Sequence, residues 1–135
     1  MYCVEIRDHV MIAHSLKGDA FGPAQNLHGA TYVVDVGFLR QDLDENDIVL
    51  DIGLATEQVH RILQDINYRN LDDHPDFSGR RTTTEAISRW LFDRVAAALG
   101  KGDFGPSGRA VSRLRVVLHE SHVALASYEA DLVHG

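Results

Sequence analysis

The chain has little of several features that would assign it to particular classes of protein. Its 135 residues include one cysteine, Cys3, so no disulfide can form within the chain. A lone cysteine agrees with a reducing compartment, and we expect a cytoplasmic location. Residues 1–5 lack the basic region and apolar stretch of a secretory signal, so none is expected. The longest apolar runs, such as residues 95–99, are far below the ~18 residues of a membrane span, so no membrane partner is expected.

Positive charge is also scarce. The chain has 13 Lys and Arg against 20 Asp and Glu, a net charge of −7 with histidine neutral, and its only adjacent basic pair is Arg80–Arg81. A nucleic-acid surface needs a stripe of basic residues, so no nucleic-acid partner is expected. Hydrophobic residues at 44% and charged residues at 24% indicate a globular chain, with a single domain over residues 1–135.

Histidine, by contrast, is abundant. The chain contains eight, a high number for a side chain that often serves in acid–base and metal chemistry. Chance enrichment explains the number equally well, so the positions of the histidines carry the argument.

Alternating apolar residues predict strands towards both ends of the chain. In residues 2–14 the even positions form one apolar face, which Asp8 interrupts, so a bulge or bend is expected there. The same alternation runs through residues 28–38 and 114–120. A fourth, more mixed strand is expected around residues 123–131.

The middle of the chain predicts two helices. Apolar residues recur at helical spacing over residues 54–66 and again over residues 86–99. Residues 82–85, Thr-Thr-Thr-Glu, resemble a capping box before the second helix, and Gly100 suits its C-terminal cap. The order strand, strand, helix, helix, strand, strand predicts an α+β fold, in which an antiparallel four-stranded sheet carries both helices on one face.

Three titratable residues lie at the ends of predicted strands, on faces that are otherwise apolar. His14 ends the first strand, His28 begins the second, and Glu120 ends the third. A polar side chain on such a face needs a partner to offset its lost hydration, so a ligand site at this rim is one interpretation. Simple contact with solvent is the other. His119 has the opposite alternation from Glu120 and is expected to point away from that site.

Several motifs together resemble the 6-pyruvoyl-tetrahydropterin synthase / 6-carboxy-tetrahydropterin synthase family. Each motif is weak alone, but their order and spacing match the family over nearly the whole chain. The matching segments are IAHSL at residues 12–16, LHGATY at 27–32, VLDIG at 49–53, NYRNLD at 67–72, TTE at 83–85 and HES at 119–121.

The resemblance implies the tunnelling fold, with the element order ββααββ. In that family, subunits assemble into oligomeric barrels and active sites form between neighbouring subunits. A homo-oligomer with sites at its subunit interfaces is therefore expected. Such an assembly would also explain polar residues on core-facing strands of a small domain.

The chain departs from the family at the zinc site. The family holds zinc with three histidines; His14 and His28 match two of them, but Ala30 occupies the third position. Two histidines and water make a poor zinc site. No cofactor is therefore expected, although a substitute ligand such as His9 or His122 would make zinc possible.

The catalytic groups of the family are also missing. Its synthases use a cysteine where this chain has Ala24, and an Asp–His pair where it has Asn67 and Tyr68. The usual proton transfers cannot run on alanine and asparagine. Tyr68 could transfer a proton in place of the missing histidine, or it could be only a packing aromatic.

The glutamate of the family is retained as Glu120. The resemblance implies that Glu120 holds adjacent N–H donors of a pterin, with Thr83 near the same ring, so the substrate is expected to carry an amine or amidine group. The predicted catalytic residues are Glu120, Tyr68 and His28. Substrate binding is assigned to Glu120, Thr83 and His14.

Three functions are compatible with this sequence. The first is a divergent enzyme, which uses acid–base chemistry to form or break a carbon–carbon or carbon–nitrogen bond in specialised metabolism. A cyclisation of the Pictet–Spengler type and a retro-aldol cleavage are two versions. The second is a pterin or deazapterin-pathway synthase with relocated catalytic groups. The third is a non-catalytic pterin- or purine-binding protein.

Overall fold

One sheet organises the chain in the computed structural model, which describes residues 1–133. Its strands lie in the order β3-β1-β2-β4-β5, with all neighbours antiparallel except β3 and β1. The strands are β1 (Tyr2–His14), β2 (His28–Arg40), β3 (Arg69–Asn70), β4 (Arg113–His119) and β5 (Leu125–Asp131). The helices are α1 (Ile52–Leu63), α2 (Thr84–Lys101) and the short α3 (Gly105–Gly108), with 3-10 turns at Asp19–Gln25, Leu71–Asp73 and Pro75–Phe77.

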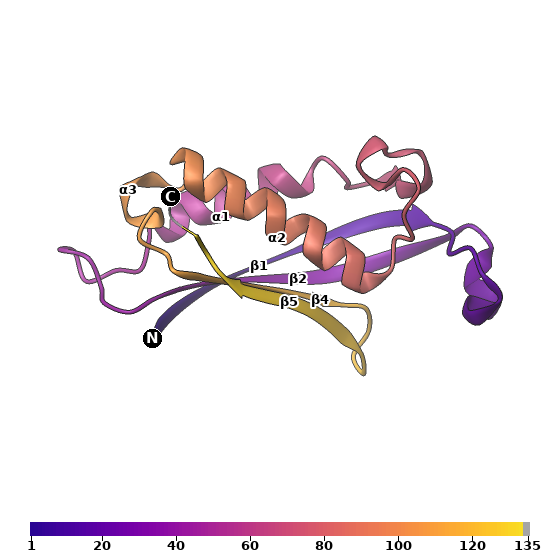
Figure 1. Cartoon of the computed structure of the whole chain (residues 1–135), viewed down its shortest axis with the longest axis horizontal. Coiled ribbons are helices and arrows are strands. Elements are labelled where there is room, and N and C mark those ends of the chain that lie inside the picture. Colours follow the sequence, from indigo (N-terminus) through magenta and orange to yellow (C-terminus); the bar gives the residue numbers. More distant parts are fainter. Residues whose placement is uncertain (134–135) are drawn as a thin grey trace.

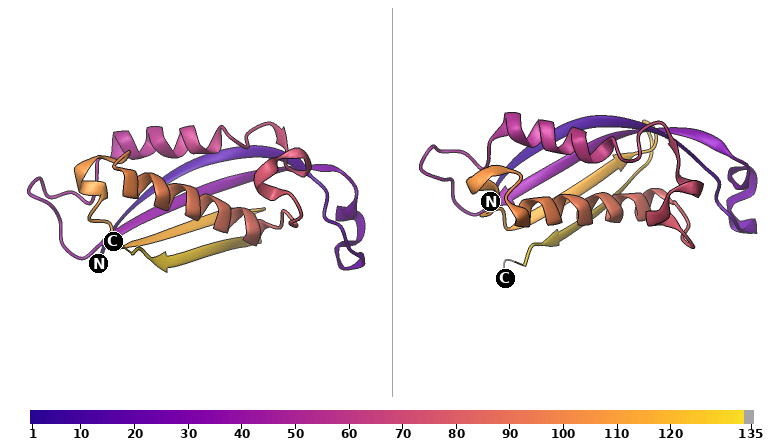
Figure 2. Two further views of the ribbon diagram at one scale, coloured as in Figure 1. Left: turned by 45° about the horizontal axis from the view of Figure 1, so that its top comes forward. Right: turned by 90° about the horizontal axis from the view of Figure 1, so that it is seen from above.

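The two long helices cover one face of the sheet and leave the other face bare (Figure 1). Seen from above, α1 and α2 lie side by side across the strands (Figure 2). The even-numbered residues of β1, β2 and β4 point towards these helices and form the core, as the alternation predicted. Among them are Val10, Val34, Val36, Phe38 and Leu114, each fully buried. The predicted α+β fold is confirmed. None of the described helices is long and apolar enough to cross a membrane.

The bulge expected at Asp8 is wrong. β1 and β2 pair without interruption from Tyr2 opposite Arg40 to His14 opposite His28. Asp8 stays in this regular ladder because its carboxylate has a partner in the helix layer: Oδ2 lies 2.8 Å from Nδ1 of His60 on α1.

The sheet has five strands, not the predicted four. The additional strand, β3, pairs with only Ile12 and Ala13 of β1, in parallel. Two residues are too few to show any alternation of apolar and polar side chains, so this strand cannot be predicted from the pattern. The fourth predicted strand begins at Leu125, two residues later than expected. A single domain over residues 1–135 stays a prediction, and its last two residues lie outside the described part.

The ends of α2 agree only in part with the sequence. Thr83 is the N-cap, and its hydroxyl accepts a hydrogen bond from the Ala86 N–H at 3.1 Å, as half of a capping box would. Gly100 is not the C-cap, because the helix continues to Lys101 and ends at Gly102. Gly102 has a φ of 89°, in the left-handed region that favours glycine.

The two glycines near this end should respond to alanine in opposite ways. Gly102→Ala should lower the free energy of unfolding by about 1–2 kcal/mol, because an alanine at this position must adopt the left-handed backbone conformation, which is unfavourable for a residue with a Cβ. That Cβ would also lie 2.9 Å from Nη2 of Arg109. Gly100→Ala should raise the free energy of unfolding by about 0.5–1 kcal/mol, because glycine within a helix is destabilising relative to alanine. A Cβ at Gly100 would lie in open space. Urea denaturation at one fixed protein concentration measures both. Equal effects of the two changes would contradict this assignment of the helix end.

Candidate functional site

The register of β1 and β2 brings two of the predicted residues together. His14 and His28 face each other at the end of the ladder, and their rings lie 4.6 Å apart at an interplanar angle of 61°. His14 is buried, whereas His28 is half-buried. The structure therefore joins these two histidines into one pair at the rim of the sheet.

Each of these histidines has one ring nitrogen bonded. Nδ1 of His28 donates to the carbonyl oxygen of Asn26 at 2.8 Å, so Nε2 of the neutral ring carries a lone pair. Nδ1 of His14 lies 2.9 Å from Oγ1 of Thr82. Burial, and secondly the neighbouring His28, lowers the pKa of His14 below its ordinary value, which favours the neutral ring.

This pair does not make a zinc site by itself. Its Nε2 atoms could supply two ligands, but Ala30 has no donor atom, and zinc sites normally use three or four protein ligands. The proposed substitute His9 points to the other face of β1 with its side chain 76% exposed, so it cannot complete the set. His122 lies in the turn between β4 and β5 and lines a cavity on the bare face of the sheet. The residues present do not fit zinc.

Asp65, His74 and Asp76 are a second group whose ligand atoms lie within 4.8 Å of one another. His74 is buried. Its Nδ1 accepts the Asp76 N–H, so Nε2 carries a hydrogen, which it shares with Asp65 at 3.2 Å. Arg94 bonds both carboxylates and Trp90 donates to Asp76. This network satisfies the group without a metal and holds residues 71–77 against α2.

The hydroxyl group of Thr83 takes part in the N-terminal cap of α2. As the N-cap of α2 it uses an oxygen lone pair for the Ala86 N–H, while its hydroxyl hydrogen stays available to a ligand. Its neighbour Thr82, which the sequence did not single out, is the threonine that contacts His14. The third threonine, Thr84, hydrogen-bonds the buried Tyr32.

Tyr68 lies apart from the histidine pair and is 78% exposed. Its φ of 59° is rare for a bulky residue, and such strain persists only where the surroundings impose it. Two bonds to the edge of β1 do so: the Tyr68 N–H donates to the Met11 carbonyl at 2.6 Å, and the side chain of Asn67 accepts the Met11 N–H at 3.0 Å. Asn67 therefore has a structural role, and no contact joins Tyr68 to His28 or Glu120 among the described residues.

Glu120 lies in the turn that follows β4 and is exposed rather than core-facing. It is not buried as a core-facing position would be, because β4 ends at His119 and the chain turns there. The negative charge of Glu120 still acts on His14, where it opposes the lowering of the pKa. Glu120 therefore lies near the histidine pair.

A cavity of about 410 Å³ adjoins Glu120 on the bare face of the sheet. His119 bonds Asp35 on this bare face, as its alternation predicts, and it lines the same cavity. The other lining residues are Arg7, Thr31, Val33, Ser121 and His122. Most of them carry groups that can donate hydrogen bonds, which suits a polar ligand.

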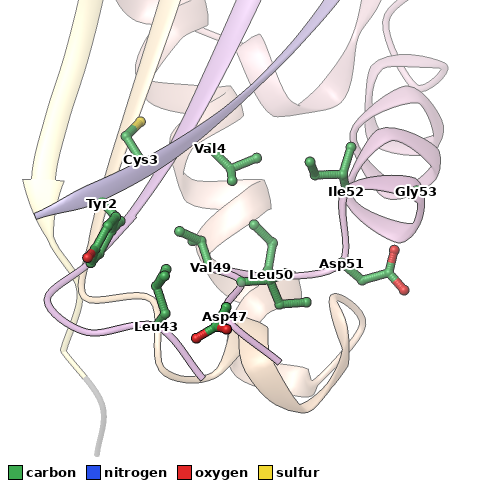
Figure 3. Close-up of a pocket in the computed structure, with 11 residues that line it drawn as sticks. Tyr2, Cys3, Val4, Leu43, Asp47, Val49, Leu50, Asp51, Ile52 and Gly53 are labelled. Atoms are coloured by element: carbon green, nitrogen blue, oxygen red, sulfur yellow. The ribbon is translucent and has the colours of Figure 1, made fainter. Parts of the chain in front are cut away.

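A second cavity, of about 610 Å³, lies beside the start of β1 (Figure 3). Val4 of β1, Leu50 of the segment before α1 and Ile52, the first residue of α1, surround it. Ile52 is 59% exposed and Tyr2, at the rim, 54%. Between Tyr2 and Val10, β1 also has no strand on its outer side, since β3 reaches only Ile12 and Ala13. An apolar cavity thus adjoins an open sheet edge.

Comparisons with known proteins agree with the motifs. Residues 3–131 match the family model of 6-pyruvoyl tetrahydropterin synthase. A 6-carboxy-5,6,7,8-tetrahydropterin synthase of Bacillus subtilis is 27% identical over 95 residues, 67% of this chain. The chain spans 63% of the length of that relative.

Solved structures show the same fold. The 6-pyruvoyl tetrahydropterin synthase of Caenorhabditis elegans has a TM-score of 0.79 at 20% identity, over 96% of this chain and 95% of that one. The Plasmodium vivax protein has a TM-score of 0.73 at 14% identity, over 98% and 100%. The predicted tunnelling fold is confirmed.

The missing third histidine yields a prediction about zinc. Protein purified without added zinc should hold far less than one zinc per chain, and Ala30→His should restore tight, stoichiometric binding by completing a three-histidine set. Thr31→His, on the other face of the same strand, is the matched control and should leave the zinc content low. Elemental analysis measures all three. One tightly held zinc in each wild-type chain would show that a substitute ligand exists.

Proposed function

The chain belongs to the 6-pyruvoyl tetrahydropterin synthase family, and on that premise we propose that it is a divergent enzyme of the family. It binds a pterin-like substrate through Glu120 and acts on it by acid–base chemistry without zinc. The relative named as a 6-carboxy-tetrahydropterin synthase supports a pterin as the substrate class.

The unpaired carboxylate of Glu120 is the observation that carries this proposal. Among the described residues, no hydrogen bond or ion pair engages its oxygens; only its backbone N–H is bonded, to the Ala124 carbonyl. A carboxylate at the edge of a cavity can accept two parallel N–H bonds from an amidine-like ring edge. Because Glu120 lies near His14, a ring bound to its carboxylate would lie beside the histidine pair, where His28 offers a lone pair at Nε2.

The chemistry differs from that of a family member with the full catalytic set. Ala24 replaces the cysteine, and Asn67 is engaged by the β1 edge. Of the residues that the motifs single out, His28 and the strained, exposed Tyr68 can still transfer a proton. They suit making or breaking a carbon–carbon or carbon–nitrogen bond beside a held amine, by cyclisation or by retro-aldol cleavage.

The loss of catalytic groups favours one further candidate, a protein that binds a pterin or purine without turnover. Incubation with reduced pterins, purines and amine–aldehyde pairs, followed by mass analysis of the products, separates the two. Turnover of a member of this panel supports the enzyme, whereas tight binding with no product supports the binding protein. Efficient conversion of a pterin to the product of an ordinary family synthase would instead support relocated catalytic groups.

We also propose that copies of the chain associate through their two open sheet edges. The outer edge of β1 and that of β5 are both unpaired, and each is flanked by exposed apolar residues: Tyr2 and Ile52 near β1, Val123 and Leu125 near β5. Pairing β1 of one copy with β5 of the next would cover both edges and the apolar cavity of Figure 3, and a repeated contact of this kind closes into a ring. The ligand site would then lie near a subunit interface.

The variant Glu120→Gln tests whether the carboxylate of Glu120 binds the ligand. This change keeps the shape of the side chain but removes the charge and one acceptor oxygen, so binding of pterin, measured by calorimetry, should weaken by about 10- to 100-fold. Folding should be unaffected, because the residue is exposed. Glu57→Gln, at an exposed position of α1, is the matched control and should bind as the wild type does. Unchanged affinity in Glu120→Gln would place the ligand elsewhere.

The association is tested by Ile52→Asp. The wild type should sediment as a multiple of the 15.0 kDa chain at micromolar concentration. The aspartate introduced at the apolar cavity should disfavour the contact between copies and shift the population from oligomer towards single chains. Leu27→Asp, at an exposed apolar residue beyond the opposite end of β1, should not. A wild-type protein that sediments only as a single chain would contradict the proposed assembly.

A further inference from the structure

A buried carboxylate lies on the face of the sheet that no helix covers. Asp35 is at the middle of β2, opposite Arg7 of β1, and its side chain is only 6% exposed. Its neighbours on β2, Val34 and Val36, point into the core instead. An ionised group in this position needs bonded partners, because its loss of hydration is otherwise uncompensated.

Three donors satisfy this carboxylate. Nε of Arg7 lies 2.6 Å from Oδ1 and Nη2 of Arg7 lies 2.8 Å from Oδ2, which is a bidentate pair. Nε2 of His119, from β4, lies 2.7 Å from Oδ2. The Arg7 hydrogen bonds above all hold the pKa of Asp35 below its ordinary value, against the effect of burial. The ionised carboxylate can only accept, so Nε2 of His119 must carry the hydrogen.

The other nitrogen of His119 is left for a ligand. With the hydrogen on Nε2, Nδ1 of the neutral ring carries a lone pair, and it has no hydrogen-bond partner within residues 1–133. The side chain is 28% exposed and lines the 410 Å³ cavity together with Glu120. A carboxylate that fixes the tautomer of a histidine, and so leaves its second nitrogen with a lone pair beside a ligand cavity, is an arrangement of acid–base catalysis.

The geometry points to His119 as the acid–base residue of the cavity beside Glu120, with Asp35 as its positioning residue. This inference rests on the proposed function, since it assigns the proton transfer in the pocket where Glu120 holds the amine. The charged and titratable groups facing His119 are Arg7 and Asp35 from β1 and β2, and Glu120 and His122 from the turn after β4.

The step involves only a proton. Nδ1 of His119 takes it from a carbon or nitrogen of the held substrate, and the electron pair of that bond stays on the substrate to form or break the adjacent bond. The resulting imidazolium is stabilised by Asp35 and returns the proton to the product, so no other reactant is consumed. Arg7 keeps Asp35 in place from the other side.

The tautomer is tested first, without any ligand. In protein labelled with ¹⁵N-histidine, long-range ¹H–¹⁵N spectra at a pH where the ring is neutral should show His119 with Nε2 protonated and Nδ1 bare. Asp35→Asn should mix the two tautomers. His9→Gln, at an exposed histidine that does not line the cavity, should leave the His119 signals unchanged. A wild-type His119 protonated at Nδ1 would overturn the inference, even if Asp35→Asn fails to fold.

The second test adds pterin to the same labelled protein. The Nδ1 resonance of His119 should shift on binding, and Glu120→Gln should remove the shift. Binding through Glu120 that leaves His119 unperturbed would overturn the inference and keep the proposed function. If the wild type binds no pterin, purine or amine, the proposed function fails and the inference fails with it.

The third test uses a substrate found by turnover screening. His119→Gln should lower kcat by about 100-fold with KM within about threefold, since a proton-transfer group contributes on that order. Asp35→Asn should lower kcat and alter its pH profile, which a merely structural role would not do. His9→Gln, at an exposed histidine that does not line the cavity, should keep kcat within about twofold. Full activity of His119→Gln would assign the proton transfer to another residue.

Discussion

The unbroken pairing of β1 with β2 is the constraint on which the rest of the structure depends. Thirteen residues of each strand are paired, from Tyr2 opposite Arg40 to His14 opposite His28. Because side chains alternate between faces, a shift of either strand by one residue would put its charged residue, Arg7 or Asp35, into the core and expose its valines. The same ladder that fixes the core therefore also sets the histidine pair at its end and the Arg7–Asp35 pair on its bare face.

Local patterns in the sequence predict much of this architecture. Alternation identifies the core faces of the strands, because a buried face demands apolar residues at every second position. The spacing of apolar residues likewise predicts the helices, and the position of His14 and His28 at strand ends correctly marks the rim. The motifs add the family, and with it the tunnelling fold. These features depend on neighbours within a few residues, which is why a single sequence reveals them.

What the sequence does not predict depends on contacts between distant segments. His119 and Asp35 are 84 positions apart, and only the register of β2 with β4 brings them together. The exposure of Glu120 follows from the end of β4 at His119, which the alternation of apolar residues does not mark. Asp35 was detectable only as a carboxylate within the apolar run of residues 33–36. Its partners could not be named without the register.

In the proposed site, which is free of metal, Glu120 holds the ligand amine and His119 transfers the proton. The most direct measurement is a crystal structure of the protein with pterin, prepared with a chelator present. N–H groups of the ring should lie on the carboxylate of Glu120, and a ring atom should lie within hydrogen-bond distance of Nδ1 of His119. Pterin bound elsewhere, or on a metal held by His14 and His28 despite the chelator, would contradict the proposed site.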